Sequence, residues 1–337
     1  MGLVYYKGFD SQILYAEETA FGTGGTLAGT NRVGKVQGVT INMKNNHFKT
    51  GAMGEGRNIV STAPGSFEVD GSIEWEVDDF TFMQYSIGKR AGSGTLIDPY
   101  ELQELNNIGY AATDIKSLKL EVGSEGATDD AITLTGVVIK DLSITASVGE
   151  VLKASCSFVA KTVSTAASFT SYTASTTKVL TFVQGACTVG SDTCPVTNFT
   201  WKLDNSINTF GKLNSRFIEQ PVTGMRLYTF SVTLRHNFDD TASVLSGKEL
   251  RSLFLGSAAA TSPATINHTA STVKLAITEG AATGDRVVSI DLENAYFESW
   301  SQPMKLDGGV IEVSVDGFGF AGLDDTGVKI PIRYYII

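Results

Sequence analysis

Alternating apolar and polar residues indicate a strand near the start of the chain and another near its middle. The segment 36–46 reads VQGVTINMKNN and the segment 196–206 reads VTNFTWKLDNS, with apolar side chains recurring at about every second position. This period is typical of a strand with one buried face. The offset from 36 to 196 is the first sign of an internal repeat.

A long connection separates each of these strands from a second alternating segment. The connections are 44–65 and 204–224, both containing Gly and Asn, and the alternating segments 66–77 and 225–238 follow. Both segments lead into an aspartate pair. The same order of strand, long loop and strand therefore occurs twice.

A short helix is predicted after each aspartate pair. In the first, Phe80, Met83 and Ile87 are spaced as on one helix face, behind Asp79 as a candidate N-cap. The second begins with a capping box. It is formed by Ser246 and Glu249, and the apolar residues Leu250, Leu253 and Phe254 follow.

Further strands complete each copy. The segment 117–122 matches 272–277, and 151–158 corresponds to 310–317. Between the copies, 164–178 is rich in Ser, Thr and Ala, a composition typical of a linker.

The predicted fold is mainly β, of the α+β type. We expect two tandem β-sandwich or small barrel domains, each with one flanking helix. The predicted organisation is an N-terminal arm at 1–32, a first domain at 33–163, the linker at 164–178, and a second domain at 179–337 that ends in a C-terminal strand.

The arm 1–32 is expected to become ordered on assembly. Its several glycines disfavour a regular core element. Its apolar side chains are then available for contacts with a neighbouring subunit, and the candidates are Tyr5, Tyr6, Phe9, Ile13 and Leu14.

Composition and charge narrow the class of protein. The chain has 337 residues, 26 Lys and Arg against 36 Asp and Glu, and a formal net charge of −10, with the basic residues scattered. This argues against tight sequence-independent binding of nucleic acid, which uses clustered basic residues. No stretch approaches the roughly 20 apolar residues of a membrane span, and the start does not resemble a signal peptide, so synthesis in the cytoplasm is expected.

Cys187 and Cys194 flank a predicted turn at Gly190-Ser191, which places them opposite each other on adjacent strands. A bridge between them is possible. Against it, a two-residue turn puts them at a hydrogen-bonded pair, where side chains lie farther apart, and cytoplasmic thiols stay reduced. The sequence leaves the question open.

No residue pattern predicts catalysis, a metal site or a cofactor. The segment 29–35 imitates a phosphate-binding loop but is followed by Val36 and a strand, and the glycines of 317–322 lack a following helix. The three histidines have no ligand spacing, and the paired aspartates fit turns better than calcium loops. We therefore expect no enzyme.

The N-terminal part of the chain resembles a known family. Residues 13–23 read ILYAEETAFGT, the long loop contains Gly54-Glu55-Gly56-Arg57, and 70–75 read DGSIEW. Together with the order of elements, these residues resemble the tail tube proteins of long-tailed bacteriophages and related viruses. The match lies mainly in the first 90 residues, and the second copy keeps the layout without the opening signature.

The resemblance implies a structural protein of the virion tail. Such proteins form stacked rings whose lumen guides double-stranded DNA and the tape-measure protein, with tail terminator and tail tip proteins as further partners. The implied contact with DNA is weak, which suits an acidic chain. No cofactor and no membrane partner are implied.

Two copies per chain depart from the family's usual ring of six single-domain subunits. If each chain supplies two copies, three chains close one ring with a pseudo-sixfold shape. The long loops are expected to join stacked rings, because loops of this length usually have a function. Their candidate anchors are Met53, Arg57 and Ile59 in the first loop, and Phe210, Leu213 and Phe217 in the second.

Other functions remain open from sequence. The inner tube of a contractile injection machine shares the implied fold. A β-rich surface adhesin or surface-layer module fits the duplication but is expected to carry a secretion signal. A carbohydrate-active enzyme needs two placed carboxylates and aromatic platforms, whereas the three tryptophans are dispersed.

Overall fold

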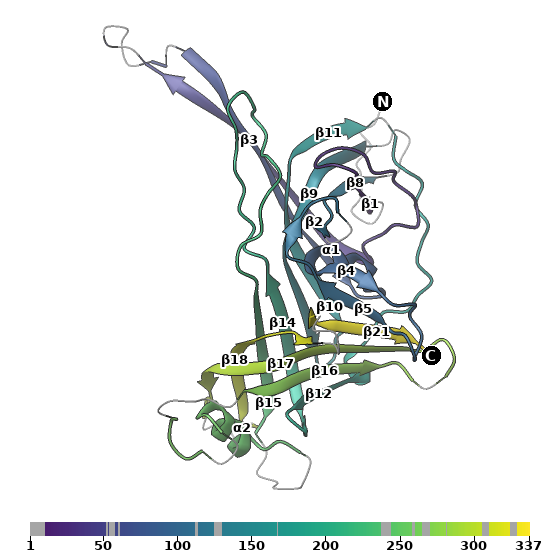
Figure 1. The fold of residues 1–337 in the computed structure, drawn as a ribbon, viewed down its shortest axis with the longest axis vertical. Helices are drawn as coiled ribbons and strands as arrows, with labels where there is room; N and C mark the ends of the chain where they lie inside the picture. Colours follow the sequence, from purple (N-terminus) through teal and green to yellow (C-terminus); the bar gives the residue numbers. More distant parts are fainter. Residues whose placement is uncertain are drawn as a thin grey trace, which may run out of the picture.

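The computed structural model describes residues 11–337, except 52, 54–57, 60, 112–113, 125–129, 167, 237–243, 258–259, 265–269, 281, 305–309 and 324–328. The described chain is mainly β, with long antiparallel sheets and two short α-helices (Figure 1). This confirms the predicted fold class.

One large antiparallel sheet runs through the whole molecule. Eight strands pair in succession, and β9 and β14 join the two halves of the chain in its middle. In order across the sheet they are β2 (Lys35–Thr50), β3 (Ser61–Glu76), β10 (Lys153–Ala160), β9 (Asp130–Ser147), β14 (Val196–Asp204), β15 (Leu227–Arg235), β18 (Glu312–Gly319) and β17 (Arg286–Ser301).

Two smaller sheets form a second layer, one for each half. The long strands β9 and β17 pass from the large sheet into these layers, so each half folds back on itself around apolar side chains. The first is ordered β11 (Thr162–Ala166), β9, β8 (Leu118–Ser124) and β1 (Ser11–Glu17). The second is ordered β21 (Ile332–Ile336), β17, β16 (Ser271–Thr278) and β12 (Gly185–Val189).

Short elements complete the molecule. The hairpin of β4 (Gly88–Ala91) and β5 (Tyr100–Glu104) belongs to the first half but adds to β21 of the second. The others are β6 (Asn107–Ile108), β7 (Asp114–Ile115), β13 (Asp192–Cys194), β19 (Gly322–Leu323), β20 (Lys329–Ile330), η2 (Thr81–Met83), η3 (Phe182–Gln184), α1 (Gln84–Ile87) and α2 (Gly247–Phe254).

The two halves share several bulges as well as their strand order. An extra residue interrupts the pairing of β2 with β3 at Gln37, and of β14 with β15 at Thr197. A second extra residue occurs at Lys140 in β9 and at Glu298 in β17. Since a bulge fixes register locally, these matches set a residue-by-residue correspondence between the halves.

Most predicted correspondences agree with this register. Val36 corresponds to Val196, as the sequence predicted, and 151–158 corresponds to 310–317. The match of 117–122 with 272–277 was wrong by two residues, because the shared irregularity aligns Leu118 with Ser271. A shift of two preserves the alternation of faces, which is why the pattern alone did not reveal it.

The helices fit the predictions unequally. The capping box of α2 is present, with Glu249 N donating to Ser246 Oγ at 3.2 Å and Ser246 N donating to Glu249 Oε2 at 2.8 Å. The first predicted helix is only the turn η2 followed by the four residues of α1. The predicted N-cap Asp79 was wrong by one residue, because the N-cap is Phe80. The Asp79 carboxylate still accepts from Thr81 N at 2.7 Å, next to the start of the turn.

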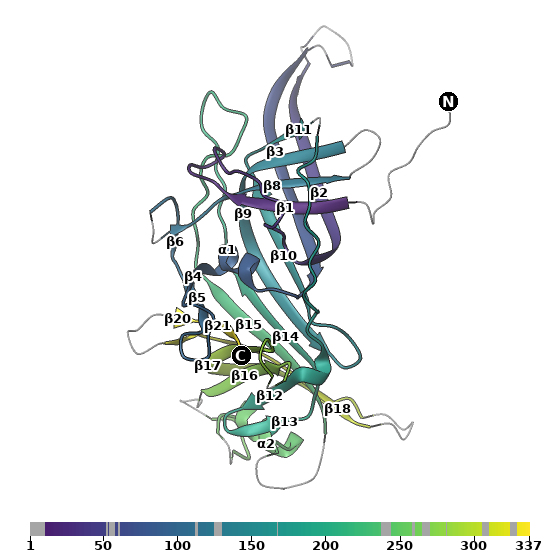
Figure 2. The same cartoon turned by 90° about the vertical axis from the view of Figure 1, so that its right-hand side faces the viewer.

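One continuous apolar core extends through both halves. Trp75 and Trp201 lie in β3 and β14 with exposed fractions of 1% and 0%. The predicted linker 164–178 begins within β11, and 168–178 has no regular structure as it leads toward the second half (Figure 2).

Candidate assembly surfaces

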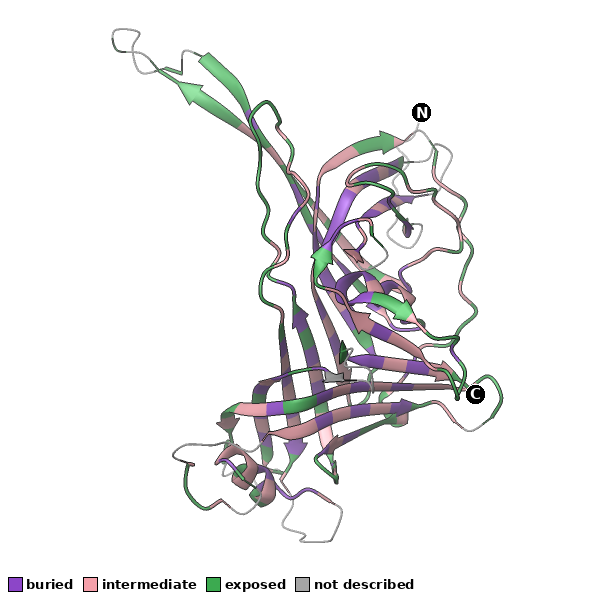
Figure 3. Ribbon diagram, viewed as in Figure 1, coloured by how far each residue is buried: buried purple, intermediate pink, exposed green. Residues whose placement is uncertain are grey.

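The hairpin of β2 and β3 continues far beyond the body of the molecule (Figure 1). Most of its outer part is exposed (Figure 3). Polar contacts across the hairpin stabilise it there, since Asn46 Nδ2 donates to Ser66 Oγ at 2.7 Å and to Glu68 Oε1 at 2.9 Å. We call residues 44–68 the arm from here on; it is a different segment from the N-terminal residues 1–32.

The tip of the arm carries the predicted anchors. Met53 is fully exposed and Ile59 is 57% exposed, whereas Arg57 lies outside the described residues. The structure therefore presents two of these three side chains to solvent at the end of the arm.

The loop 205–226 of the second half lies against the base of the arm. Arg216 Nε donates to Gly65 O at 2.8 Å, and Phe67 N donates to Arg216 O at 2.8 Å. Phe217 meets Phe67 edge to face, with ring centroids 6.0 Å apart. Phe217 thus contacts its own chain, although it is still 39% exposed, and Phe210 and Leu213 are exposed as well.

A polar cluster connects the loop to the first half and was missed from sequence. Arg226 Nη2 donates to Ile87 O at 3.0 Å and Leu105 O at 2.9 Å, and its guanidinium lies 3.4 Å from Glu104. Tyr228 Oη donates to the same carboxylate at 2.6 Å, and burial raises the pKa of Tyr228 well above its ordinary value. We call these residues the latch. No local pattern marks a lone arginine as a partner of distant carbonyls.

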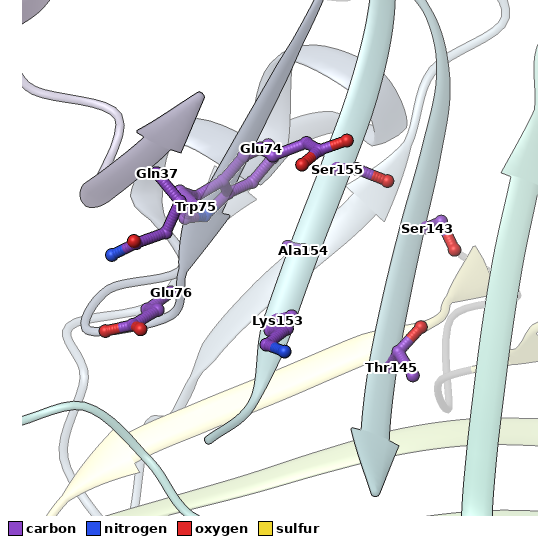
Figure 4. Close-up of a pocket in the computed structure, with 9 residues that line it drawn as sticks. All are labelled: Gln37, Glu74, Trp75, Glu76, Ser143, Thr145, Lys153, Ala154 and Ser155. Atoms are coloured by element: carbon purple, nitrogen blue, oxygen red, sulfur yellow. The ribbon is translucent and has the colours of Figure 1, made fainter. Parts of the chain in front are cut away.

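The face of the large sheet that turns away from the core is dominated by hydroxyl groups. On β3, β10 and β9 it is hollowed, with a volume of about 480 Å³ (Figure 4). Cross-strand pairing sets two rows there, Glu74–Ser155–Ser143 and Glu76–Lys153–Thr145. The same face continues over β14, β15 and β18 with Thr200, Thr229, Ser231, Thr233 and Ser314.

The hollow is a shallow depression on a sheet. Its acidic residues stand beside lysine and hydroxyl groups, and the described residues contain no group of three or more His, Cys, Asp or Glu that is able to hold a metal ion. Its shape suits passing contact with a polar surface better than enclosure of a small molecule.

Both outer edges of the large sheet are open within the described chain. β2 pairs with β3 alone, and residues 296–301 of β17 pair with β18 alone. By contrast, β9 and β14 at the centre are paired on both sides. Open edges of this kind are available for pairing with another chain.

The predicted N-terminal contacts are placed differently from expectation. Ile13 and Leu14 lie in β1, paired with β8, with exposed fractions of 3% and 0%. They are therefore core residues of this chain, because β8 offers an edge that β1 covers. Tyr5, Tyr6 and Phe9 lie outside the described residues.

Cys187 and Cys194 are directly opposite each other, as predicted. Both are buried free thiols. A hydrogen bond with Cys187, together with burial, raises the pKa of Cys194 above its ordinary range, so this thiol stays protonated.

No helix in the described part of the chain has the length and apolar character needed to cross a bilayer. No curated protein matches the chain significantly. A family model described as phage tail tube protein matches residues 8–295 and thus covers most of the sequence, including the arm, the latch and the central junction of the sheet. The chain therefore belongs to the phage tail tube protein family.

Proposed function

We propose that this chain is the structural, non-enzymatic subunit of stacked rings, each made of three chains with a pseudo-sixfold shape, that form the conduit for DNA ejection. Family membership places the protein in the virion tail. The number of chains per ring, the faces used and the partners in the lumen are our inference.

The observation that supports this proposal best is the repeated arrangement of strands and bulges. We infer two tail-tube-like domains, one at 33–163 and one at 179–337. Strand order, Gln37 with Thr197, and Lys140 with Glu298 all correspond between them. Two such domains per chain turn a ring of six domains into a ring of three chains.

The central junction supports ring closure. β9 and β14 pair antiparallel over seven residue pairs and join the two domains side by side in one sheet. The sheet then ends in two open edges, one contributed by each domain. Repetition of a side-by-side arrangement around an axis closes a ring and removes the open edges.

The hydroxyl-rich face of the large sheet fits the wall of the lumen. Ser and Thr side chains offer weak neutral contacts, and acidic groups such as Glu74 and Asp316 repel phosphates. The tape-measure protein and double-stranded DNA would move along such a wall without tight binding.

The arm and the loop 205–226 fit contacts between stacked rings. The arm extends beyond the body and ends in the exposed residues Met53 and Ile59. Leu213 is 96% exposed at the end of the loop. Tail terminator and tail tip proteins would cover the same surfaces at the two ends of the tube.

Native mass spectrometry of isolated rings, together with a reconstruction of tubes without imposed symmetry, tests the proposal. We expect three chains and six domains per ring. Six chains per ring, or twelve domains, would overturn it.

A further inference from the structure

We propose that the chain-to-chain contact in the ring is an antiparallel pairing of β2 with the end of β17 in the next chain, with Asn42 opposite Ser301 and Met43 opposite Trp300. This inference rests on the proposed ring. It assigns one occupant, a second copy of this chain, to both open edges of the large sheet.

The template is the junction inside the chain. There β9 and β14 are opposite each other in the register Leu142 with Leu203 and Ser143 with Lys202. This pairing joins the first domain to the second. The contact between the second domain and the first domain of the next chain is its counterpart.

The matching bulges show which residues of the open strands β2 and β17 correspond to the paired residues of β14 and β9. Counted from the extra residues Gln37 and Thr197, Met43 corresponds to Leu203. Counted from the extra residues Lys140 and Glu298, Trp300 corresponds to Leu142. Since Leu203 is opposite Leu142, Met43 falls opposite Trp300.

Differences in burial support the assignment. Leu203 and Leu142 are 0% and 1% exposed, because each is covered across the junction. Their counterparts are not: Met43 is 51% exposed and Trp300 is half-buried against Phe254 of α2. Apolar side chains on the core-facing side of an open strand indicate a surface that a partner covers.

The pattern continues along both strands. Val39 and Ile41 are half-buried, whereas their counterparts Phe199 and Trp201 are fully buried. On the other side of the proposed contact, Met304 lies just beyond the end of β17 and is 76% exposed. It falls opposite Val39 when the register is continued. Pro303 falls opposite Thr40. Because proline has no N–H to donate, backbone hydrogen bonding between the two chains should end near this residue.

Cysteine cross-linking tests the register. In assembled rings, Asn42→Cys with Ser301→Cys should form a disulfide between chains on mild oxidation, because opposite residues bring their Cβ atoms within bonding range. In a ring of three chains the covalent ladder on a non-reducing gel should end at three. The native cysteines are buried and serve as internal controls.

Two further variants complete the experiment. Lys44→Cys with Ser299→Cys has the same proposed register and should also cross-link, which guards against a fault specific to one pair. Thr40→Cys with Ser299→Cys is four residues out of register and should not. Two results would overturn this inference and leave the proposed function standing. One is equal cross-linking in the shifted pair, and the other is no cross-linking in either of the first two pairs. Failure of the wild-type chain to form rings overturns the proposed function instead.

Discussion

Two cross-strand pairs of the large sheet contain the same residue types in exchanged positions. Gly71 of β3 lies opposite Phe158 of β10, and Phe230 of β15 lies opposite Gly317 of β18. By the shared register, Gly71 corresponds to Phe230 and Phe158 to Gly317. Each half therefore places one phenyl ring over one glycine, but from opposite strands, as expected where the summed volume of a pair is constrained.

This exchange predicts the outcome of a swap. A Cβ atom on Gly71 would lie 2.5 Å from Phe158 Cζ and 2.2 Å from Thr40 O. Gly71→Phe should therefore lower the free energy of unfolding by about 1–3 kcal/mol or more. Adding Phe158→Gly removes the clash with the phenyl ring and should restore part of the lost stability. The rest of the loss should remain, because the clash with Thr40 O is still present.

Urea unfolding of the single and double variants measures this coupling, and Phe158→Gly alone is the matched control. If the losses of the two single variants simply added in the double variant, the two side chains would not be competing for the same space. The exchange was not predictable from the sequence, because it becomes visible only when the strand register is known.

A second residue-scale prediction concerns Glu279 and pH. Arg286 Nε donates to Glu279 Oε2 at 2.8 Å, and this hydrogen bond lowers the pKa of the carboxyl below its ordinary value. The same guanidinium donates to Asp78 O and Lys178 O, each at 2.7 Å. The pair thus connects the start of β17 to the first half of the chain and to residues 164–178, the predicted linker.

Because the folded-state pKa is depressed, the stabilisation is present above the unfolded pKa of about 4.3 and is lost as pH falls through the folded value. Glu279→Gln should lower the free energy of unfolding by up to about 1 kcal/mol at pH 7. The difference from wild type should decrease as pH falls below about 4.3. Thermal unfolding across pH checks this, and a difference that grows in acid would contradict it.

At the scale of elements, the latch is a charge-paired, buried contact that joins the second half of the chain to the first. Its guanidinium and the Glu104 carboxylate are 14% and 9% exposed. Removal of one partner leaves the other charged and buried, so Arg226→Met should cost about 3 kcal/mol. Arg226→Met with Glu104→Gln should cost less than Arg226→Met alone. A double variant less stable than either single one would argue against a charge-paired latch.

The arm gives the second prediction at this scale. Phe48 and Ala63 are partners across the hairpin, so 49–62 can be replaced by an Asn-Gly turn. The matched variant joins Asn208 to Val222, which also face each other, by the same turn. If the arm and loop connect rings, both variants should fold and form rings but no tubes. Electron microscopy and circular dichroism decide this, and normal tubes from both variants would contradict the stacking role.

Elements with a clear period or cap were predictable from sequence. The inner parts of β2 and β3 and the capping box of α2 follow from residues close together in the chain. The predicted loop 44–65 was wrong at both ends, because 47–50 and 61–64 continue the same two paired strands. β1 was taken for part of an arm because its glycine-rich neighbours conceal its pairing with β8, more than a hundred residues away. The addition of β5 to β21 and the contacts of Arg226 depend on distant partners in the same way, and no local pattern encodes them.

At the scale of the whole molecule, the two halves of the chain share one core and one sheet. Apolar contacts, the β9–β14 junction and the latch all cross between them. We therefore expect a single cooperative unfolding transition despite the length of the chain. Trp75 and Trp201 lie in different halves of the chain. Their fluorescence, isolated by Trp→Phe replacement of the other tryptophans, should therefore give coincident urea midpoints. Two separated midpoints would show independent domains.

The junction inside the chain has contacts that the proposed junction between chains would lack. In the shared register Arg226 corresponds to Phe67, so the proposed junction would have no latch. The hairpin of β4 and β5 adds a further contact to the junction inside the chain, through the pairing of β5 with β21. The described residues contain no second hairpin of this kind that could do the same between chains. Under mechanical load, the proposed ring would therefore separate into whole chains.

The single arm of each chain also affects how rings are oriented on one another. In a ring of three chains, long arms alternate around the rim with the shorter loops 205–226. A neighbouring ring turned by one domain would set arms where loops belong, whereas a turn of one whole chain restores every contact. In the proposed tube, the arm would therefore restrict the rotation between neighbouring rings to angles that bring each arm to the same receiving site.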